Sequence, residues 1–334
     1  ERVGPIRSLR MPDFELAHIY NSLIATSGMA NGYVAQLYED EFVLNSLLVG
    51  EGPCPAMCRD LELDRNWEYT LFGNVPELYN LAAEQGSILD YRPLSGMAFA
   101  DAMPTGGIGL NAMDILYYRY STVGWAYDAA RGVWLRSHNG APHTDAVSGN
   151  QLTAANVVIL EAEHTPIGAR NPGDWGVDGN AVYATPLQGS GRLILLRDGQ
   201  YFEGEWRRER RGGDLRFYDR AGNVLPFKPG NTYFQLLPEW PGAYQLTFYP
   251  SLPATATITV GSVYLRWGPT MNFVEGGYGY AGDELPAVGR NNAGTWVQVL
   301  YEDVQQKALW VPVEYVNLNV DVMTLPLARP TTEG

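Results

Sequence analysis

The chain has 334 residues and a formal net charge of −14, which argues against nucleic acid and against an anionic membrane surface as partners. Charged residues make up 18% of the chain and aromatic residues 12%, a profile typical of β-rich proteins. No uninterrupted apolar run approaches the roughly 18 residues that a spanning helix needs, so we expect no transmembrane segment.

Residues 1–105 predict a mixed α/β region. Apolar residues near helical spacing, with Asp13 as the N-cap, predict an amphipathic helix over 11–24. A second helix is predicted over 76–85, because a proline occupies its first turn and a glycine follows its end.

Only two cysteines are present, Cys54 and Cys58. A structural zinc ion takes four ligands, so this pair is a poor metal signal, and we expect neither a metal nor another cofactor. In an oxidising compartment the two thiols are candidates for a small disulfide loop; otherwise they are two reduced thiols in a turn. In both cases the expected role is structural.

Two glycine-rich stretches predict loops. Residues 98–111 are interpreted as a flexible connection into a β-rich middle domain, which we place at 106–250. Residues 166–190 form a longer excursion, and long loops of this kind often carry contacts. We therefore name Trp175, within that excursion, as a candidate binding residue.

One group of polar residues in the middle domain could form a catalytic site. The spacing of His143 and Asp145 can bring an imidazole and a carboxylate together, and Arg136 could hold an anionic group. Alternatively, Asp145 and Asn156 form hydrogen bonds with backbone groups of turns, while Arg136 pairs with a carboxylate on a neighbouring strand. Since no serine or cysteine nucleophile sits in a recognisable elbow, we favour the structural interpretation.

The stretch from Arg192 to Pro238 predicts an antiparallel β-meander. Its turn signals divide it into five short strands, and Asp198-Gly199 is a dipeptide that readily forms a tight hairpin turn. The loop that follows Trp206 is basic. Its four arginines are Arg207, Arg208, Arg210 and Arg211. They could receive an anionic partner or an acidic surface of a second copy, or they could form a solvated turn.

Several short motifs in this stretch resemble those of a known protein family. Asp198-Gly199-Gln200-Tyr201, Glu203-Gly204-Glu205-Trp206 and Pro229-Gly230-Asn231-Thr232-Tyr233, in this order, resemble the C-terminal domain of the YerB-like lipoprotein family of bacteria. The resemblance implies an extracellular or cell-envelope protein of poorly defined activity. A histidine that this family carries before its second helix is missing from the corresponding residues 66–73. Since the chain begins with Glu1 rather than Met, we expect a processed or truncated N-terminus that lacks a signal or anchor segment.

Residues 255–322 predict a third domain, a small barrel of five short strands. The sequences Tyr264-Leu265-Arg266-Trp267-Gly268-Pro269 and Gly294-Thr295-Trp296-Val297 are similar to bacterial SH3-like domains. Such domains generally bind cell-wall peptides, glycan or other proteins, so the resemblance implies a binding role. Candidate binding residues are Trp267, Tyr278 and Tyr280. Tyrosine and tryptophan concentrate at interfaces, so these rings could also cover a joint within the chain or join two copies.

The sequence thus predicts an α+β protein with a mixed α/β N-terminal region, a β-rich middle domain containing an antiparallel meander, and a C-terminal SH3-like β-barrel. The leading hypothesis is a non-catalytic envelope protein that binds cell-wall glycan or peptide, or a protein partner, and that can self-assemble as a homo-oligomer. The alternative is a cell-wall-modifying enzyme that uses His143 and Asp145. Family context alone suggests a third hypothesis, a regulator of wall synthases.

Overall fold

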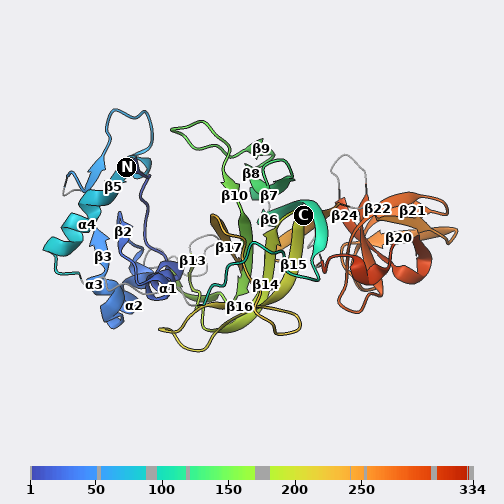
Figure 1. Cartoon of the computed structure of the whole chain (residues 1–334). Coiled ribbons are helices and arrows are strands. Elements are labelled where there is room, and N and C mark those ends of the chain that lie inside the picture. Colours follow the sequence, from blue (N-terminus) through green and yellow to red (C-terminus); the bar gives the residue numbers. More distant parts are fainter. Residues whose placement is uncertain are drawn as a thin grey trace. The chain divides into compact units, whose positions relative to one another are not determined.

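The computed structural model describes residues 2–50, 54–87, 96–117, 121–169, 181–240, 242–251, 254–301, 307–328 and 330. The fold is β-rich with a few short helices, as predicted for the fold class (Figure 1). Contacts divide the chain into two compact units. Unit 1 comprises Glu1–Met97, Ala162–Ser190 and Arg207–Arg216, and unit 2 comprises Ala98–Glu161, Gly191–Trp206 and Phe217–Gly334. Both units are discontinuous in sequence. Most of the region predicted as the middle domain lies in unit 2 with the C-terminal residues, but Ala162–Ser190 and Arg207–Arg216 belong to unit 1.

Unit 1 contains the α-helices of the described part of the chain and several short strands. The helices are α1 (Met11–Tyr20), α2 (Val34–Glu39), α3 (Glu41–Asn45) and α4 (Val75–Glu84). The strands are β1 (Arg2–Val3), β2 (Ile24–Thr26), β3 (Leu47–Val49), β4 (Met57–Arg59), β5 (Leu71–Asn74), β12 (Thr165–Ala169) and β13 (Ala181–Ala184). Strands β1, β5 and β4 form one sheet, while β2 pairs with β3 in parallel and β12 with β13.

The first helix is shorter than the sequence predicts. Helix α1 ends at Tyr20 because Asn21 adopts a left-handed conformation with φ of 49°, and Ile24 already begins β2. Asp13 lies at the third helical position and not at the N-cap, which is Arg10. Its carboxylate accepts the backbone N–H of Arg10 at 2.7 Å, so the acid still satisfies an orphan donor of the first turn.

A disulfide joins Cys54 and Cys58 just before and within β4. Met57, between them, is fully buried and packs with Leu71 and Leu78 in a small core. The cross-link therefore lies at the edge of a packed sheet, where a structural role is expected. No helix among the described residues has both the length and the apolar composition that crossing a membrane requires.

An 11-stranded sheet forms most of the middle of the chain. Its main path runs β10-β8-β7-β6-β15-β14-β11-β17, with β16, β18 and β9 attached at its sides. The strands are β6 (Ile108–Tyr117), β7 (Ser121–Asp128), β8 (Val133–His138), β9 (Ala141–Pro142), β10 (Thr153–Ala154), β11 (Asn156–Ala162), β14 (Gly189–Arg197), β15 (Gln200–Arg208), β16 (Arg216–Asp219), β17 (Thr232–Pro238) and β18 (Tyr244–Pro250). A core that includes Trp125, Trp134 and Phe248 packs against it.

The predicted meander is present only in part. Strands β14, β15 and β16 pair in sequence order, whereas β17 pairs with β11. The segment between β16 and β17 makes isolated bridges, from Val224 to Tyr218 and from Phe227 to Phe99. The predicted loop over 98–111 is also shorter, since β6 already begins at Ile108. The partners of β17 and of the first residues of β6 are strands distant in sequence, β11 and β15, which turn signals alone do not reveal.

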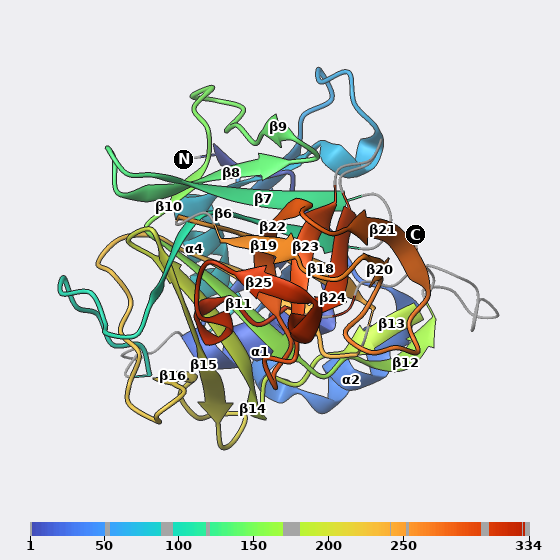
Figure 2. The same cartoon turned by 90° about the vertical axis from the view of Figure 1, so that its right-hand side faces the viewer.

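The C-terminal residues form a seven-stranded sheet in the order β21-β20-β24-β23-β22-β19-β25 (Figure 2). The strands are β19 (Thr255–Ile258), β20 (Ser262–Arg266), β21 (Glu275–Tyr280), β22 (Glu284–Arg290), β23 (Trp296–Tyr301), β24 (Lys307–Pro312) and β25 (Val316–Leu318). This order is an open path, and within the described residues no pairing joins β21 to β25. The structure therefore shows a curved β-module rather than the closed barrel that the sequence predicts.

Candidate functional site

Arg136 and His143 meet at the edge of the middle sheet. Strand β8 holds Arg136, which is buried, and its guanidinium donates to Nδ1 of the His143 ring. The backbone supports the pair, because the N–H of His143 donates to the carbonyl of Arg136 at 3.0 Å. The guanidinium also lies 5.2 Å from the centre of the Tyr233 ring. Two of the three candidate catalytic residues therefore contact each other, although the sequence suggested Asp145 as the partner of His143.

The carboxylate of Asp145 forms hydrogen bonds with the backbone of its own loop. Its Oδ1 accepts the backbone N–H groups of Val147 at 3.2 Å and Ser148 at 2.7 Å, which is the geometry of an Asx turn. These backbone bonds hold the pKa of the exposed Asp145 carboxyl below its usual value. Among the hydrogen bonds of the described residues, none joins Asp145 to His143. The arrangement offers a neutral imidazole beside a cation, without a carboxylate to orient it, and the His143–Asp145 catalytic pair stays a prediction.

The pKa of His143 provides a direct test of this arrangement. Burial lowers it first, and the positive charge of Arg136 and the neighbouring His138 lower it further. We expect an NMR titration to place His143 below an ordinary histidine. Arg136→Gln should raise its pKa, while His138→Gln should raise it less. The pKa of His143 is lower in the folded state than in the unfolded state. Its small contribution to stability is therefore present at pH values above the unfolded-state pKa and is lost as the pH falls through the folded-state pKa. An unchanged His143 pKa in Arg136→Gln would contradict the pairing.

Two of the four arginines of the predicted basic loop are internal to unit 1. Arg208 is fully buried, with Nη1 donating to Glu15 Oε2 at 2.5 Å and to the carbonyl of Leu187 at 3.0 Å. Arg211 donates from Nε to the other oxygen of Glu15 at 3.1 Å and forms an ion pair with Asp40 at 2.9 Å. These two guanidinium groups are therefore engaged within the fold. Arg207 is exposed near the end of β15, which also contains Arg208, and Arg210 is exposed in the turn that follows.

A cluster of three tyrosines covers the outer face of β20 and β21. Period-2 alternation turns Val263 and Leu265 into the core and leaves Tyr264 outside, 47% exposed. Tyr264 lies directly opposite Tyr278 in the antiparallel register, with ring centres 4.9 Å apart and edge-to-face. Tyr280, 60% exposed, continues the row at 5.1 Å from Tyr278. We refer to Tyr264, Tyr278 and Tyr280 as the tyrosine face.

A pocket of about 320 Å³ adjoins the tyrosine face. Tyr264 and Arg266 line it together with Met271, which is more than half exposed. The guanidinium of Arg266 is held in place by the carbonyl of Phe273 at 2.8 Å and lies 6.0 Å from the Tyr264 ring. The site thus combines apolar area, phenolic hydroxyls and one oriented cation. Sequence analysis identified Tyr278 and Tyr280 but not Tyr264 and Arg266 as site residues, although the alternation of β20 could have indicated both.

The remaining predicted binding residues are spread over different places. Trp267 is partly buried, with Lys307 Nζ 5.9 Å from its ring centre. Trp175 lies outside the described residues. Within the described part of the chain, no group of three or more His, Cys, Asp or Glu side chains could hold a metal ion.

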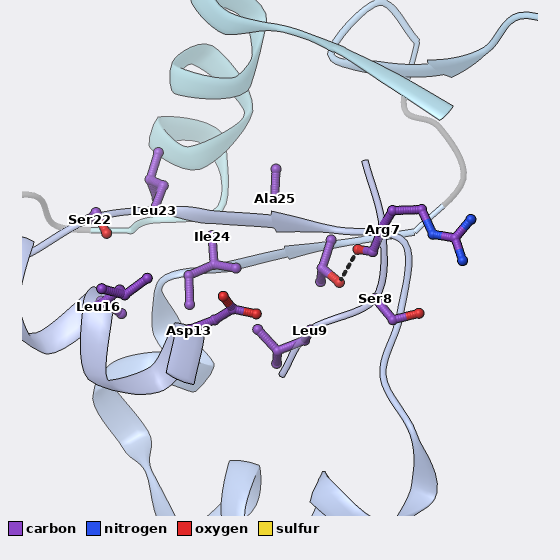
Figure 3. A pocket seen from close by; sticks show the side chains of 11 residues that line it. Arg7, Ser8, Leu9, Asp13, Leu16, Ser22, Leu23, Ile24 and Ala25 are labelled. Carbon is purple, nitrogen blue, oxygen red and sulfur yellow. Dashed lines mark hydrogen bonds between the residues drawn. The ribbon is translucent and has the colours of Figure 1, made fainter. Parts of the chain in front are cut away.

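A second pocket, of about 300 Å³, lies in unit 1 beside α1 and β2 (Figure 3). Leu9, Leu16 and Ile24 give it apolar walls, and the carboxylate of Asp13 faces the space between them. Burial raises the pKa of Asp13. The guanidinium of Arg7 extends away from this space (Figure 3). The one acid of this pocket already bonds to the backbone at the start of its own helix, so we place the candidate site at the tyrosine face instead.

Comparisons with known proteins agree with this fold and leave the activity open. Residues 113–234 match the C-terminal domain of a protein of unknown function (DUF3048). The chain is similar to a protein described as "Putative lipoprotein YerB" of Bacillus subtilis, with 25% identity over 248 residues, which is 72% of this chain and 68% of the relative. The crystal structure of the YerB protein from Bacillus subtilis aligns with a TM-score of 0.57 and 22% identity, over 74% of this chain and 77% of that chain. At this identity the structural likeness supports the fold alone.

Proposed function

We propose that this chain is a non-catalytic protein of the bacterial cell envelope that binds cell-wall glycan through the tyrosine face. The similarity to a Bacillus subtilis protein described as "Putative lipoprotein YerB" supports the envelope location. The observation that carries the binding role is the row of Tyr264, Tyr278 and Tyr280, two of which leave about half or more of their surface exposed. The similarity of the C-terminal module to SH3-like domains is part of the same proposal.

The chemistry of the tyrosine face suits a neutral glycan. Tyrosine rings supply a large contact area at low conformational cost and carry a hydroxyl for hydrogen bonding. Sugar rings present apolar C–H faces and several hydroxyls, which such a surface can contact together. The net charge of −14 disfavours anionic polymers at long range, while Arg266 offers one local donor group at the rim.

The tyrosine face can be tested by removing two rings that the fold does not need. We expect Tyr264→Ala/Tyr280→Ala to weaken sedimentation with insoluble peptidoglycan by at least about tenfold, a loss of about 1.4 kcal/mol. The matched control is Tyr38→Ala/Tyr79→Ala, since both of these tyrosines are exposed and belong to unit 1. The control should bind as the wild type does.

A size measurement of the same proteins separates glycan binding from self-assembly. If the tyrosine face joins two copies, the wild type should be larger than a monomer and Tyr264→Ala/Tyr280→Ala should reduce it to one. Unchanged sedimentation with peptidoglycan in that variant would contradict the glycan proposal whatever the size.

A further inference from the structure

Unit 2 contains a buried cluster of charged side chains where β14 and β15 meet the C-terminal module. Three arginines, Arg192, Arg220 and Arg290, lie there with two glutamates, Glu161 and Glu203. Arg290 is 3% exposed, and the side chains of Glu161 and Glu203 are 3% and 8% exposed. Burying charges in this way is costly unless each one is paired and hydrogen-bonded.

Arg192 bonds to both carboxylates, and Arg220 bonds to one of them. Arg192 donates from Nη1 to Glu161 Oε1 at 3.0 Å and from Nη2 to Glu203 Oε1 at 2.8 Å. Arg220 pairs with Oε2 of Glu203. Nη2 of Arg192 also reaches the carbonyl of Leu327 at 3.0 Å, which ties the cluster to the end of the described chain. No salt bridge within the described residues links Arg290 to a carboxylate.

Arg290 and Tyr201 have donors without a partner among the described residues. The hydrogen bonds of the Arg290 guanidinium go to the carbonyls of Asn291 at 3.1 Å and Asn292 at 3.4 Å, while its buried Nε has no described partner. The hydroxyl of Tyr201, 1% exposed, is also buried with no partner in the described part of the chain. A buried donor that stays unsatisfied destabilises the folded state.

The unused donors lie in one electrostatic environment. Burial raises the pKa of Tyr201, and the positive charges of Arg290, Arg220 and Arg192 act against that rise. Burial also lowers the pKa of Arg220, and the charge of Arg290 lowers it further. Among the described members of the cluster, three guanidinium charges face two carboxylate charges, which leaves one positive charge without a described counterion.

We propose that this cluster binds one small monovalent anion, held by the Tyr201 hydroxyl and by the guanidinium groups of Arg290 and Arg220. The anion supplies the missing negative charge and accepts the unused O–H and N–H donors. Arg220, whose side chain is 54% exposed, gives the anion access from solvent. Because Tyr201 belongs to β15 and Arg290 to β22, the anion stabilises the contact of the C-terminal module with the large sheet inside unit 2.

Tyr201→Phe is the decisive variant, because the proposal reverses the sign of its effect. Without a bound anion, removing an unpartnered buried hydroxyl leaves the protein as stable or makes it more stable. With a bound anion, the variant loses a ligand contact. We expect chloride to raise the unfolding midpoint of the wild type by about 3 °C over a bulky sulfonate buffer anion at equal ionic strength. The chloride-dependent shift should fall by at least half in Tyr201→Phe and in Arg220→Gln.

Tyr249→Phe is the matched control for loss of a tyrosine hydroxyl. Tyr249 donates to Asp114 Oδ2 at 3.0 Å, so the variant should lower the midpoint equally in both anions. Broadening of the chloride NMR signal by the protein, present in wild type and Tyr249→Phe and reduced in Tyr201→Phe, would support the site directly. The proposal is overturned if Tyr201→Phe keeps the full chloride dependence, or if the wild type shows none.

Discussion

Replacing Arg208 with methionine is expected to destabilise unit 1 by about 3–5 kcal/mol, which is a large part of the stability of a typical domain. The guanidinium of Arg208 is fully buried and bonds to Glu15 and to the carbonyls of Leu187 and Gly213. Methionine fills a similar volume but leaves the Glu15 carboxylate, itself 7% exposed, with Arg211 as its remaining described cation. The dominant cost is a buried carboxylate that has lost the more deeply buried of its two cations.

Urea unfolding followed by circular dichroism measures this effect. Arg210→Met is the control, because Arg210 is exposed in the turn that directly follows β15. The control should change the unfolding free energy by less than about 0.5 kcal/mol. Equal effects of the two substitutions would show that Arg208 and Glu15 are not paired in solution.

Asn156→Ala is expected to lower the unfolding free energy by about 3 kcal/mol. Asn156 is fully buried at the start of β11, and its amide serves as a substitute for sheet pairing with a distant segment. Its Nδ2 donates to the carbonyl of Lys228 at 2.8 Å and to Thr232 Oγ1 at 3.1 Å, and its Oδ1 accepts the N–H of Lys228 at 2.7 Å. Alanine leaves the Lys228 backbone groups without these partners.

The same unfolding experiment tests this substitution, and an unchanged slope with denaturant would show that the folded state has kept its compactness. Asn150→Ala is the control, since Asn150 is exposed in the Asp145 loop. A loss for Asn156→Ala no larger than that of the control would mean that solvent satisfies the Lys228 segment. That outcome would remove the structural role that we assign to Asn156.

Local physics allowed the sequence to predict the elements whose signals lie within a few residues. The Asp198-Gly199 turn is an example: Asp198 has φ of 52° and Gly199 of 69°, and β14 ends and β15 begins on its two sides. A primed turn needs positive φ at both positions, which this dipeptide tolerates. The helix predicted over 76–85 is present as Val75–Glu84 for a similar reason. Its capping signals are adjacent to it.

The candidate site was predicted in part. Two rings of the tyrosine face, Tyr278 and Tyr280, were named from composition, but the partner Tyr264 came from the register of β20 against β21. For His143 the sequence suggested Asp145 as the partner, whereas the structure supplies Arg136. Spacing along the chain indicates only which side chains are able to come into contact. The pairing of strands in the sheet determines which of them do.

The sequence by itself determined the β-rich α+β character of the protein, its tight turns and the alternation that separates core from surface in each strand. Only the tertiary structure decided which charged side chains are buried and which partners they contact. Arg208 meets Glu15 across a separation of 193 residues, and Arg192 meets Leu327 across 135. The residues around an arginine do not indicate whether it will be buried, because its pairing depends on contacts that form only when distant segments pack.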